Sequence, residues 1–311
     1  MPGVYYAPVN PVLPLSSPGK VLYKGAMKIP ARLQPLIEEG LIDDVTSRLM
    51  SGKEADVFVV RRNDDMLCAK VYKAAEKRSF KQAVLYREGR KTRNSRRARA
   101  MDKGSKYGRD QQEQVWHTAE LDALTRLADA GVRVPRPFAC IDGVLLMELV
   151  TDSDGAVAPR LSEVFMSAEE ALAGHAEVIR FVVRMLCAGL VHGDLSEFNI
   201  LVDASGPVII DLPQAVDAAA NNNARFMLER DVNKISRFYG QFAPELLNTR
   251  YASEIWKLFE DGDLHPEIAL TGTFIDSTQA ADVDGVLLEI DAAIAEEQAR
   301  QERLKDAETQ A

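Results

Sequence analysis

The sequence predicts an α+β fold, with a small antiparallel sheet in its first half and mainly helices in its second half. Alternating, β-branched segments within residues 55–73 and 136–150 predict the sheet. In the second half, Ser167 and Glu170 form a capping box that opens a long apolar segment, which indicates a helix. The composition is that of a globular protein, because 46% of the 311 residues are hydrophobic and 27% are charged.

The order of these patterns predicts four parts along the chain. Six prolines and little hydrophobic periodicity predict a disordered arm over residues 1–32. We expect a sheet-rich lobe over residues 33–150, a helical lobe over residues 151–295 and a charged helical tail over residues 296–311. The chain is long enough for both lobes to bury a hydrophobic core.

Two hairpins are expected in the sheet-rich lobe, because each pair of β-patterned segments is joined by residues that favour a tight turn. The expected strands are residues 55–62 and 66–73 around Asn63-Asp64-Asp65, and residues 136–141 and 144–150 around Asp142-Gly143. Between the hairpins, residues 111–130 carry a partial apolar stripe that ends before Gly131, which predicts a helix.

A strongly basic segment precedes this helix. Residues 87–109 hold ten basic and two acidic residues and almost no bulky apolar residue, which predicts a mobile loop or a frayed helix on the surface. Any contact with RNA phosphates would weaken steeply with salt, because each neutralised phosphate releases a counterion. The alternative is a solvated insertion without a partner, and charge alone favours neither interpretation.

In the helical lobe, the long helix after the capping box is expected to end near Gly189. Two short strands at residues 200–202 and 208–210 should flank a turn at Ser205-Gly206. The pattern from Ala218 onward is largely helical.

Composition also disfavours several classes of protein. The net charge of −9 argues against nucleic-acid binding over the whole surface. No apolar run approaches the roughly 18 to 20 residues of a membrane-spanning helix and no signal peptide is evident, so we expect a cytoplasmic protein without membrane contact. The three cysteines, Cys68, Cys140 and Cys187, lack the spacing of a disulfide framework or a zinc site.

The strongest chemical signal is the run from His192 to Asn199, His-Gly-Asp-Leu-Ser-Glu-Phe-Asn, followed by Ile209-Ile210-Asp211. Phosphoryl transfer from ATP needs a carboxylate near the acceptor and oxygen ligands for a divalent metal between the phosphates. Asp194, Asn199 and Asp211 supply that set. Taken singly, each of the three is more simply explained as a capping, turn or strand-closing residue.

Residues upstream favour the phosphotransfer interpretation. Lys70 lies on an expected strand, where it can reach the phosphates, and Glu120 on the following helix can hold it by ion pairing. Residues 51–57, Ser-Gly-Lys-Glu-Ala-Asp-Val, lie at a loop-to-strand boundary where backbone N–H groups can approach phosphate. A lysine on a strand is otherwise usually a solvated edge residue, and this loop has a single glycine.

Together, these motifs resemble the RIO family of atypical serine/threonine protein kinases, in its prokaryotic form. The resemblance covers about residues 41–242. Its motifs are Gly52-Lys53-Glu54-Ala55-Asp56-Val57, Ala69-Lys70-Val71-Tyr72-Lys73, Leu-Val-His-Gly-Asp-Leu-Ser-Glu-Phe-Asn at residues 190–199, and Ile210-Asp211-Leu212-Pro213-Gln214. The first motif and the basic segment are similar to one branch of the family, and Asp-Leu-Pro-Gln is similar to another.

The resemblance implies a bilobal protein-kinase-like fold that binds ATP with Mg²⁺, or with Mn²⁺ in its place, between a small antiparallel-sheet N-lobe and a reduced helical C-lobe. It implies that Asp194 is the catalytic carboxylate. Asp211 would be a metal ligand and a second catalytic residue, as the acceptor of an aspartyl-phosphate. The other implied site residues are Asn199 as a metal ligand, Lys70 as phosphate anchor, Glu120 as its partner, Ser51 and Lys53 over the phosphates, Met147 as gatekeeper, and Glu148 and Val150 with backbone groups at the adenine edge.

The implied activity is a serine/threonine protein kinase that phosphorylates itself or a protein substrate, or acts mainly as an ATPase. The helical platform that usually grips a peptide is missing after Gln214, so peptide substrates should be few. One alternative is a nucleotide-gated assembly factor with weak ATPase activity that holds RNA or the small ribosomal subunit through residues 87–109. The other is a small-molecule phosphotransferase, against which Ser196-Glu197-Phe198 argues.

Other residues are weaker candidates. Arg225, Arg230 and Asp231 could support the catalytic loop from behind, and the sequence assigns them no firm role. The remaining histidines, His117, His175 and His265, are too dispersed to predict a metal site.

Overall fold

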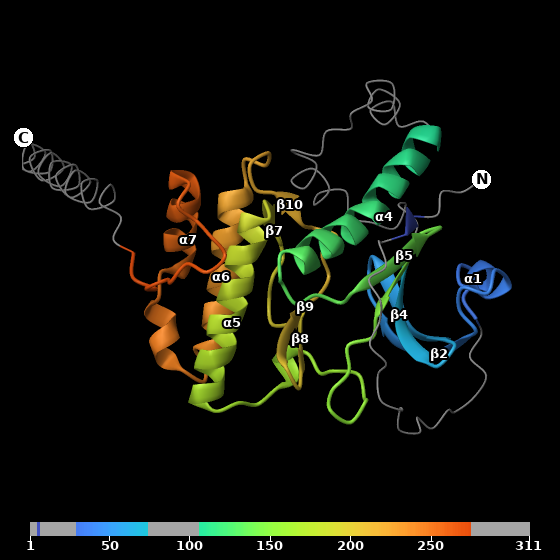
Figure 1. Ribbon diagram of the computed structural model, residues 1–311, viewed down its shortest axis with the longest axis horizontal. Coiled ribbons are helices and arrows are strands. Elements are labelled where there is room, and N and C mark those ends of the chain that lie inside the picture. Colours follow the sequence, from blue (N-terminus) through green and yellow to red (C-terminus); the bar gives the residue numbers. More distant parts are fainter. Residues whose placement is uncertain (1–4, 7–28, 74–105, 275–311) are drawn as a thin grey trace, which may run out of the picture. The chain divides into compact units, whose positions relative to one another are not determined.

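The computed structural model describes residues 5–6, 29–73 and 106–274, with side chains from residue 118 onward in the last range (Figure 1). The chain divides into a large unit, Met1–Leu270, and a short one, Thr271–Ala311. The predictions of a basic loop over residues 87–105 and of a helical tail over residues 296–311 lie outside the described residues.

Six strands form one antiparallel sheet in the order β1-β5-β6-β4-β3-β2. Their bounds are β1 Tyr5–Tyr6, β2 Asp44–Ser51, β3 Ala55–Arg62, β4 Asp65–Tyr72, β5 Pro137–Ile141 and β6 Val144–Glu148. Strands β3 to β6 confirm the two predicted hairpins, whereas the sequence did not predict β1 and β2. Strand β1 pairs with β5 and covers its edge. Residues 5–6 therefore form a strand, whereas the sequence predicted disorder there.

Both hairpin turns contain residues in the left-handed backbone region, as short turns between twisted strands require. Asn63 has a φ of 54°, and Asp142 and Gly143 have φ of 47° and 76°. Asn, Asp and Gly tolerate this conformation best, which is why the sequence indicates these turns.

Strand β4 lies inside the sheet, and this position decides the environment of Lys70. Lys70 is opposite Val57 on β3 and Leu145 on β6. It is 7% exposed, so it is not a solvated edge residue.

The two faces of the sheet belong to two hydrophobic cores. One face packs with Leu33 and Leu36 around helix α1 (Gln34–Glu38), which the sequence did not predict. Helix α4 (Lys106–Asp129) packs on β5 and β6, and its buried residues Leu121 and Leu124 belong to the larger core. The sequence predicted this helix from residue 111, but it begins at Lys106. Residues 106–109, the last part of the basic segment, are therefore helical.

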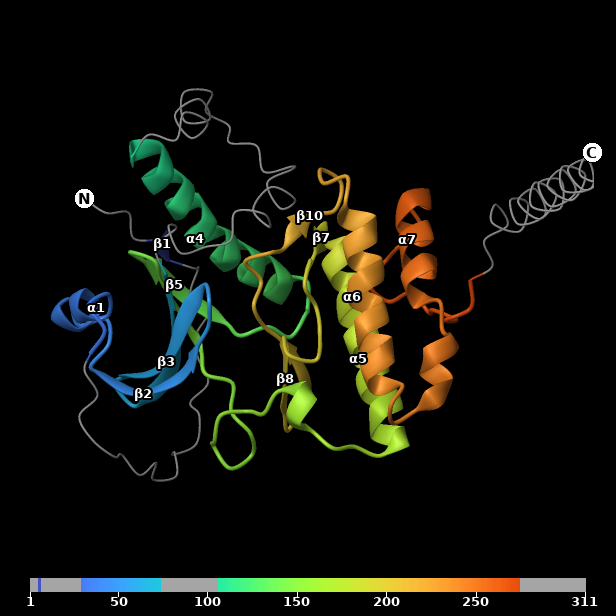
Figure 2. The same cartoon turned by 180° about the vertical axis from the view of Figure 1, so that it is seen from behind.

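The second half of the large unit is mainly helical. Its helices are η2 Leu161–Glu163, α5 Ala168–Cys187, α6 Ala224–Tyr239, η3 Pro244–Asn248 and α7 Tyr251–Asp261. The predicted capping box is present, because Ser167 Oγ accepts a hydrogen bond from Glu170 N at 3.2 Å. Helix α6 packs against α5 and α7 (Figure 2). None of the described helices combines the length and hydropathy needed to cross a membrane.

Short strands position the loops beside these helices. They are β7 Leu190–Val191, β8 Ile200–Asp203, β9 Gly206–Ile209 and β10 Val216–Asp217. Strands β8 and β9 form the second-half hairpin that the sequence predicted, and β7 pairs with β10. The loop His192–Asn199, called the catalytic loop below, joins β7 to β8, and Asp211 follows β9 closely.

Candidate active site

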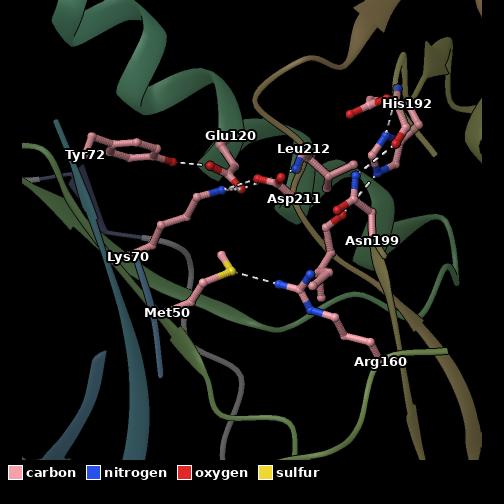
Figure 3. Close-up of polar contacts among 11 residues, drawn as sticks. Met50, Lys70, Tyr72, Glu120, Arg160, His192, Asn199, Asp211 and Leu212 are labelled. Atoms are coloured by element: carbon pink, nitrogen blue, oxygen red, sulfur yellow. Dashed lines mark hydrogen bonds and ion pairs between the residues drawn. The ribbon is translucent and has the colours of Figure 1, made fainter. Parts of the chain in front are cut away.

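Lys70 makes ion pairs with two carboxylates from distant parts of the chain (Figure 3). Its Nζ lies 2.8 Å from Oε1 of Glu120 on α4 and 2.5 Å from Oδ1 of Asp211. The Glu120 side chain is 1% exposed, whereas that of Asp211 is 45% exposed. The structure therefore brings three of the predicted site residues together at one point.

These ion pairs keep Lys70 and Asp211 charged. Burial alone would lower the pKa of Lys70, but the carboxylates of Glu120 and Asp211 outweigh burial and raise it above its usual value. The Lys70 ammonium in turn holds the pKa of the Asp211 carboxyl below its ordinary value. Asp211 is thus ionised at neutral pH, as a metal ligand must be. Its φ of 67° is a strained backbone conformation of the kind that clusters at functional sites.

Glu120 is held by two further groups that the sequence analysis missed. The Tyr72 hydroxyl donates to Glu120 Oε2, and the Leu212 amide donates to Oε1 at 3.3 Å. Tyr72 follows Lys70 by two positions on β4, and side chains two apart on a strand share a face. This two-residue spacing is the sequence signal that could have identified Tyr72 as a site residue.

The catalytic loop brings Asp194 close to Asn199. Asn199 Nδ2 donates to the backbone oxygen of Asp194 at 2.9 Å, and Asn199 Oδ1 accepts no hydrogen bond from the described residues. His192 Nε2 lies 3.1 Å from the carbonyl oxygen of Ile210, so the loop is tied to the residue before Asp211.

Helix α6 holds the catalytic loop through Asp231 and Arg230. Asp231 Oδ2 accepts a hydrogen bond from Gly193 N at 2.9 Å, and the Arg230 guanidinium donates to the Gly193 carbonyl. Asp231 is 3% exposed, and burial raises the pKa of its carboxyl although nearby cationic groups oppose this effect. Arg225 pairs with Glu229 on the same helix at 2.9 Å.

Lys234, also on α6, is a site residue that the sequence analysis missed. Its Nζ lies 3.1 Å from Asp194 Oδ1, and the two side chains are 36% and 44% exposed. Lys234 follows Asp231 by three positions, so both lie on similar faces of the helix.

The segment of residues 51–57 is organised around Asp56 rather than around several glycines. Asp56 Oδ1 accepts a hydrogen bond from Ser51 Oγ at 2.7 Å and pairs with Arg48 at 2.6 Å. Burial acts to raise the pKa of Asp56, but these partners outweigh it and lower the pKa. Lys53 is exposed and makes no hydrogen bond within the described residues.

The chain after β6 carries a buried amide at Val150. Val150 is 7% exposed, and its N–H has no hydrogen-bond acceptor among the described residues, whereas its carbonyl accepts from Ala158 N at 3.0 Å. Burying an unpaired donor costs about 1 to 3 kcal/mol, so this N–H is a natural place for a ligand acceptor. Glu148 N already donates to Arg136 O at 2.8 Å, and Met147 packs against the larger core.

Arg160 reaches across to the sheet from the segment before η2 (Figure 3). One of its guanidinium nitrogens lies 2.8 Å from Met50 Sδ at the end of β2. Its positive charge also helps to lower the pKa of Asp211. Nothing in the local sequence distinguishes Arg160 from a surface arginine.

A pocket of about 450 Å³ opens beside the catalytic loop. Its lining residues are Asp194, Ser196, Glu197, Phe198, Asn199, Asp211, Lys234, Arg237, Phe238 and Gln241. In the described part of the chain, no group of three or more His, Cys, Asp or Glu side chains could hold a metal ion by itself.

Comparison with known proteins decides the family. Residues 56–252 match the family profile described as the RIO domain, which is more than half of the chain. The chain belongs to the RIO family. This RIO protein therefore has the kinase-like α+β fold that the sequence predicted.

Named relatives agree with this assignment. The RIO-type serine/threonine-protein kinase Rio1 of Haloferax volcanii is 36% identical over 67% of this chain and 68% of that protein. Serine/threonine-protein kinase RIO1 of Caenorhabditis elegans is 29% identical over 71% of this chain and 42% of its own length. Serine/threonine-protein kinase RIO1 of Homo sapiens is 28% identical over 69% of this chain and 36% of that protein. This chain thus spans less than half of the last two relatives.

The family assignment confirms the predicted class of enzyme. As a RIO protein, the chain is a phosphotransferase of the serine/threonine protein kinase type. The family implies ATP, a divalent metal and a protein substrate.

Proposed function

We propose that this RIO protein is an ATP- and Mg²⁺-dependent serine/threonine protein kinase that phosphorylates itself and few other proteins. The observation that carries the proposal is the bridge from Lys70 to Glu120 and Asp211. In kinases, phosphoryl transfer requires a strand lysine, a helix glutamate that positions it and a metal-binding aspartate, all in place together.

Asp194 is the proposed catalytic base. Its partly exposed carboxylate lines the pocket, where it accepts the proton of the acceptor hydroxyl. The hydroxyl oxygen forms a bond to the γ-phosphorus of ATP, and the bond from that phosphorus to the oxygen bridging to the β-phosphate breaks. ADP leaves with the bridging oxygen.

Lys70 is the proposed anchor of the ATP phosphates, held by Glu120, with Ser51 and Lys53 over the phosphates. The adenine edge is proposed to meet backbone groups after the gatekeeper Met147, at Glu148 and Val150. The buried N–H of Val150, which no described residue accepts, supports this placement.

Asn199 and Asp211 are the proposed Mg²⁺ ligands, and Mn²⁺ is the alternative ion. Both offer the hard oxygen atoms that these cations prefer. The hydrogen bond from Asn199 Nδ2 to the Asp194 carbonyl supports the assignment, because it turns Oδ1 away from that partner. When bound, the metal neutralises charge on the phosphates of the nucleotide.

Asp211 is also the proposed acceptor in an ATPase reaction. Its carboxylate oxygen would displace ADP from the γ-phosphorus, and water would then hydrolyse the resulting aspartyl-phosphate. Lowering of its pKa supports this role, since only the carboxylate is a nucleophile. A label on the protein that hydroxylamine releases, and that Asp211→Asn lacks, is the expected result.

The second candidate function is a nucleotide-gated assembly factor that holds RNA or the small ribosomal subunit through residues 87–109. The ten basic residues of that segment support it. A small-molecule phosphotransferase is less favoured, because the relatives named above are protein kinases. We place the reaction in the cytoplasm, where ATP is available, and cell fractionation tests this location.

The fate of the labelled γ-phosphate of ATP tests the main proposal. We expect label on the protein or in free phosphate in a quenched time course with Mg²⁺, and no label on serine or threonine with the Asp194→Ala variant. Label that stays on ATP with the intact protein, at any divalent metal and with added protein acceptors, would overturn the kinase and ATPase assignments together.

A further inference from the structure

One side of the pocket beside the catalytic loop is a single face of α6. The residues concerned are Lys234, Arg237 and Phe238, which follow the i, i+3, i+4 spacing of one helical face. Gln241, which also lines the pocket, follows just after the helix ends at Tyr239. The proposed function uses Asp194, Asn199 and Asp211 from the same pocket and leaves this face without a role.

The face has a fixed position relative to Asp194. Asp231, one turn earlier on α6, holds Gly193 in the catalytic loop at 2.9 Å. On the side of α5, Ser236 Oγ lies 2.9 Å from His175 Nε2, and both residues are buried. The helix cannot slide past the loop without breaking these buried contacts.

Two positive charges lie on this face. Lys234 touches Asp194 through one contact of 3.1 Å and is 36% exposed, so its ammonium group keeps further donors for a ligand. Arg237 is exposed and has no ion pair within the described part of the chain. An arginine with a free guanidinium offers a planar, two-pronged donor set that matches a carboxylate.

Aromatic surface lies beside the charges. Phe198, from the catalytic loop, is 53% exposed, and Phe238 lines the same pocket. A peptide backbone or an apolar side chain can pack on Phe198 while the neighbouring positions of the peptide meet α6.

We propose that this face is the acceptor subsite and that it selects a serine or threonine flanked by an acidic side chain. The inference rests on the proposed kinase function and adds its substrate class. With the acceptor hydroxyl at Asp194, a neighbouring carboxylate meets Arg237 and Lys234. A lysine in that place meets like charge, which gives selection against basic peptides as well as for acidic ones.

Matched peptides test the subsite. They share one serine and differ only in Asp, Asn or Lys at the flanking positions. We expect the full-length protein to prefer Asp over Asn by about fivefold in kcat/KM, the size of one partly exposed ion pair. Arg237→Gln should reduce this preference, because only Lys234 then remains to meet the carboxylate, and it should leave the KM for ATP unchanged. Arg237→Glu should shift the preference toward Lys.

Arg225→Gln is the matched control, because it makes the same change on the same helix at an arginine paired with Glu229. It should keep the preference. If the protein phosphorylates peptides too slowly to measure kcat/KM, binding affinities replace it. The same peptides then carry alanine in place of serine, and their Kd values are measured in the presence of Mg-ADP.

The outcomes separate the two levels of the argument. Absence of label transfer to any acceptor, the protein itself included, defeats the proposed function. Label transfer or binding without an acidic preference overturns only the subsite. So does a preference that both Arg237 variants leave unchanged. A KM for ATP that rises in these variants while the peptide preference stays unchanged also overturns the subsite, because it would assign the face to the nucleotide phosphates.

Discussion

Lys70 and Glu120 stand 50 positions apart in the sequence and form a buried ion pair, with 2.8 Å between Nζ and Oε1. One comes from the interior strand β4 and the other from α4, which packs on the neighbouring strands. The pair therefore joins the helix to the sheet as well as preparing the site for a nucleotide.

Breaking this pair should destabilise the fold. Lys70→Met leaves Glu120 buried with only Tyr72 and Leu212 as partners among the described residues, and we expect the free energy of unfolding to fall by about 3 to 5 kcal/mol. Adding Glu120→Gln removes the unpaired charge and should recover at least half of that loss. Urea denaturation at pH 7 measures both, and strictly additive losses in the double variant would contradict the pairing.

Asp194 and Lys70 should differ in their effect on nucleotide binding. Asp194→Ala should abolish turnover but leave the Kd for Mg-ATP within about threefold of the unmodified protein, because the carboxylate acts on the acceptor. Lys70→Ala should raise that Kd at least about tenfold, since it removes a charge-assisted contact to the phosphates. Calorimetric titration checks both. Equal losses of affinity would remove the distinction between base and anchor.

His175 should make stability depend on pH. It is 1% exposed, and burial lowers its pKa from 6.5 to about 4. Between these values the unfolded chain binds a proton that the folded chain excludes, so the free energy of unfolding falls as pH falls. The fall totals about 3 kcal/mol from pH 6.5 to pH 4.

The variant His175→Gln isolates this effect from that of the carboxyl groups. It keeps a polar partner for Ser236, which His175 Nε2 contacts at 2.9 Å, and cannot take up the proton. Urea denaturation at pH 7 and pH 4.5 should show a smaller loss of stability in the variant. A loss equal to that of the unmodified protein would rule out His175 as the source.

The basic segment, residues 87–109, should affect RNA association and should not affect ATP turnover. Neutralising Arg93, Arg96, Arg97 and Arg99 with glutamine should weaken RNA binding and flatten its salt dependence. The slope should fall by about 0.7 for each phosphate of single-stranded RNA that the variant no longer neutralises. Intrinsic ATP turnover should not change. Binding measured by fluorescence anisotropy over a series of salt concentrations decides this, and an identical salt dependence would exclude the segment as an RNA-binding element.

Local patterns predicted much of the fold. The hairpin turns at residues 63–65 and 142–143, and the helix that begins after Ser167, depend on neighbouring residues whose preferences can be read in order along the chain. Strand β2 and helix α1 were missed. Both depend on contacts with the sheet, since α1 is short and β2 is mostly exposed, so neither shows a clear periodicity.

The sequence by itself determined the family and the residues that belong to its motifs, because these motifs are short and lie in fixed order. Only the tertiary structure decided which of these residues meet. Lys70 reaches Asp211 across 141 positions, and Lys234 and Asp231 reach the catalytic loop from α6. The physical reason is that such contacts arise from the packing of sheet, loops and helices, and no local preference encodes the distance between residues so far apart in the chain.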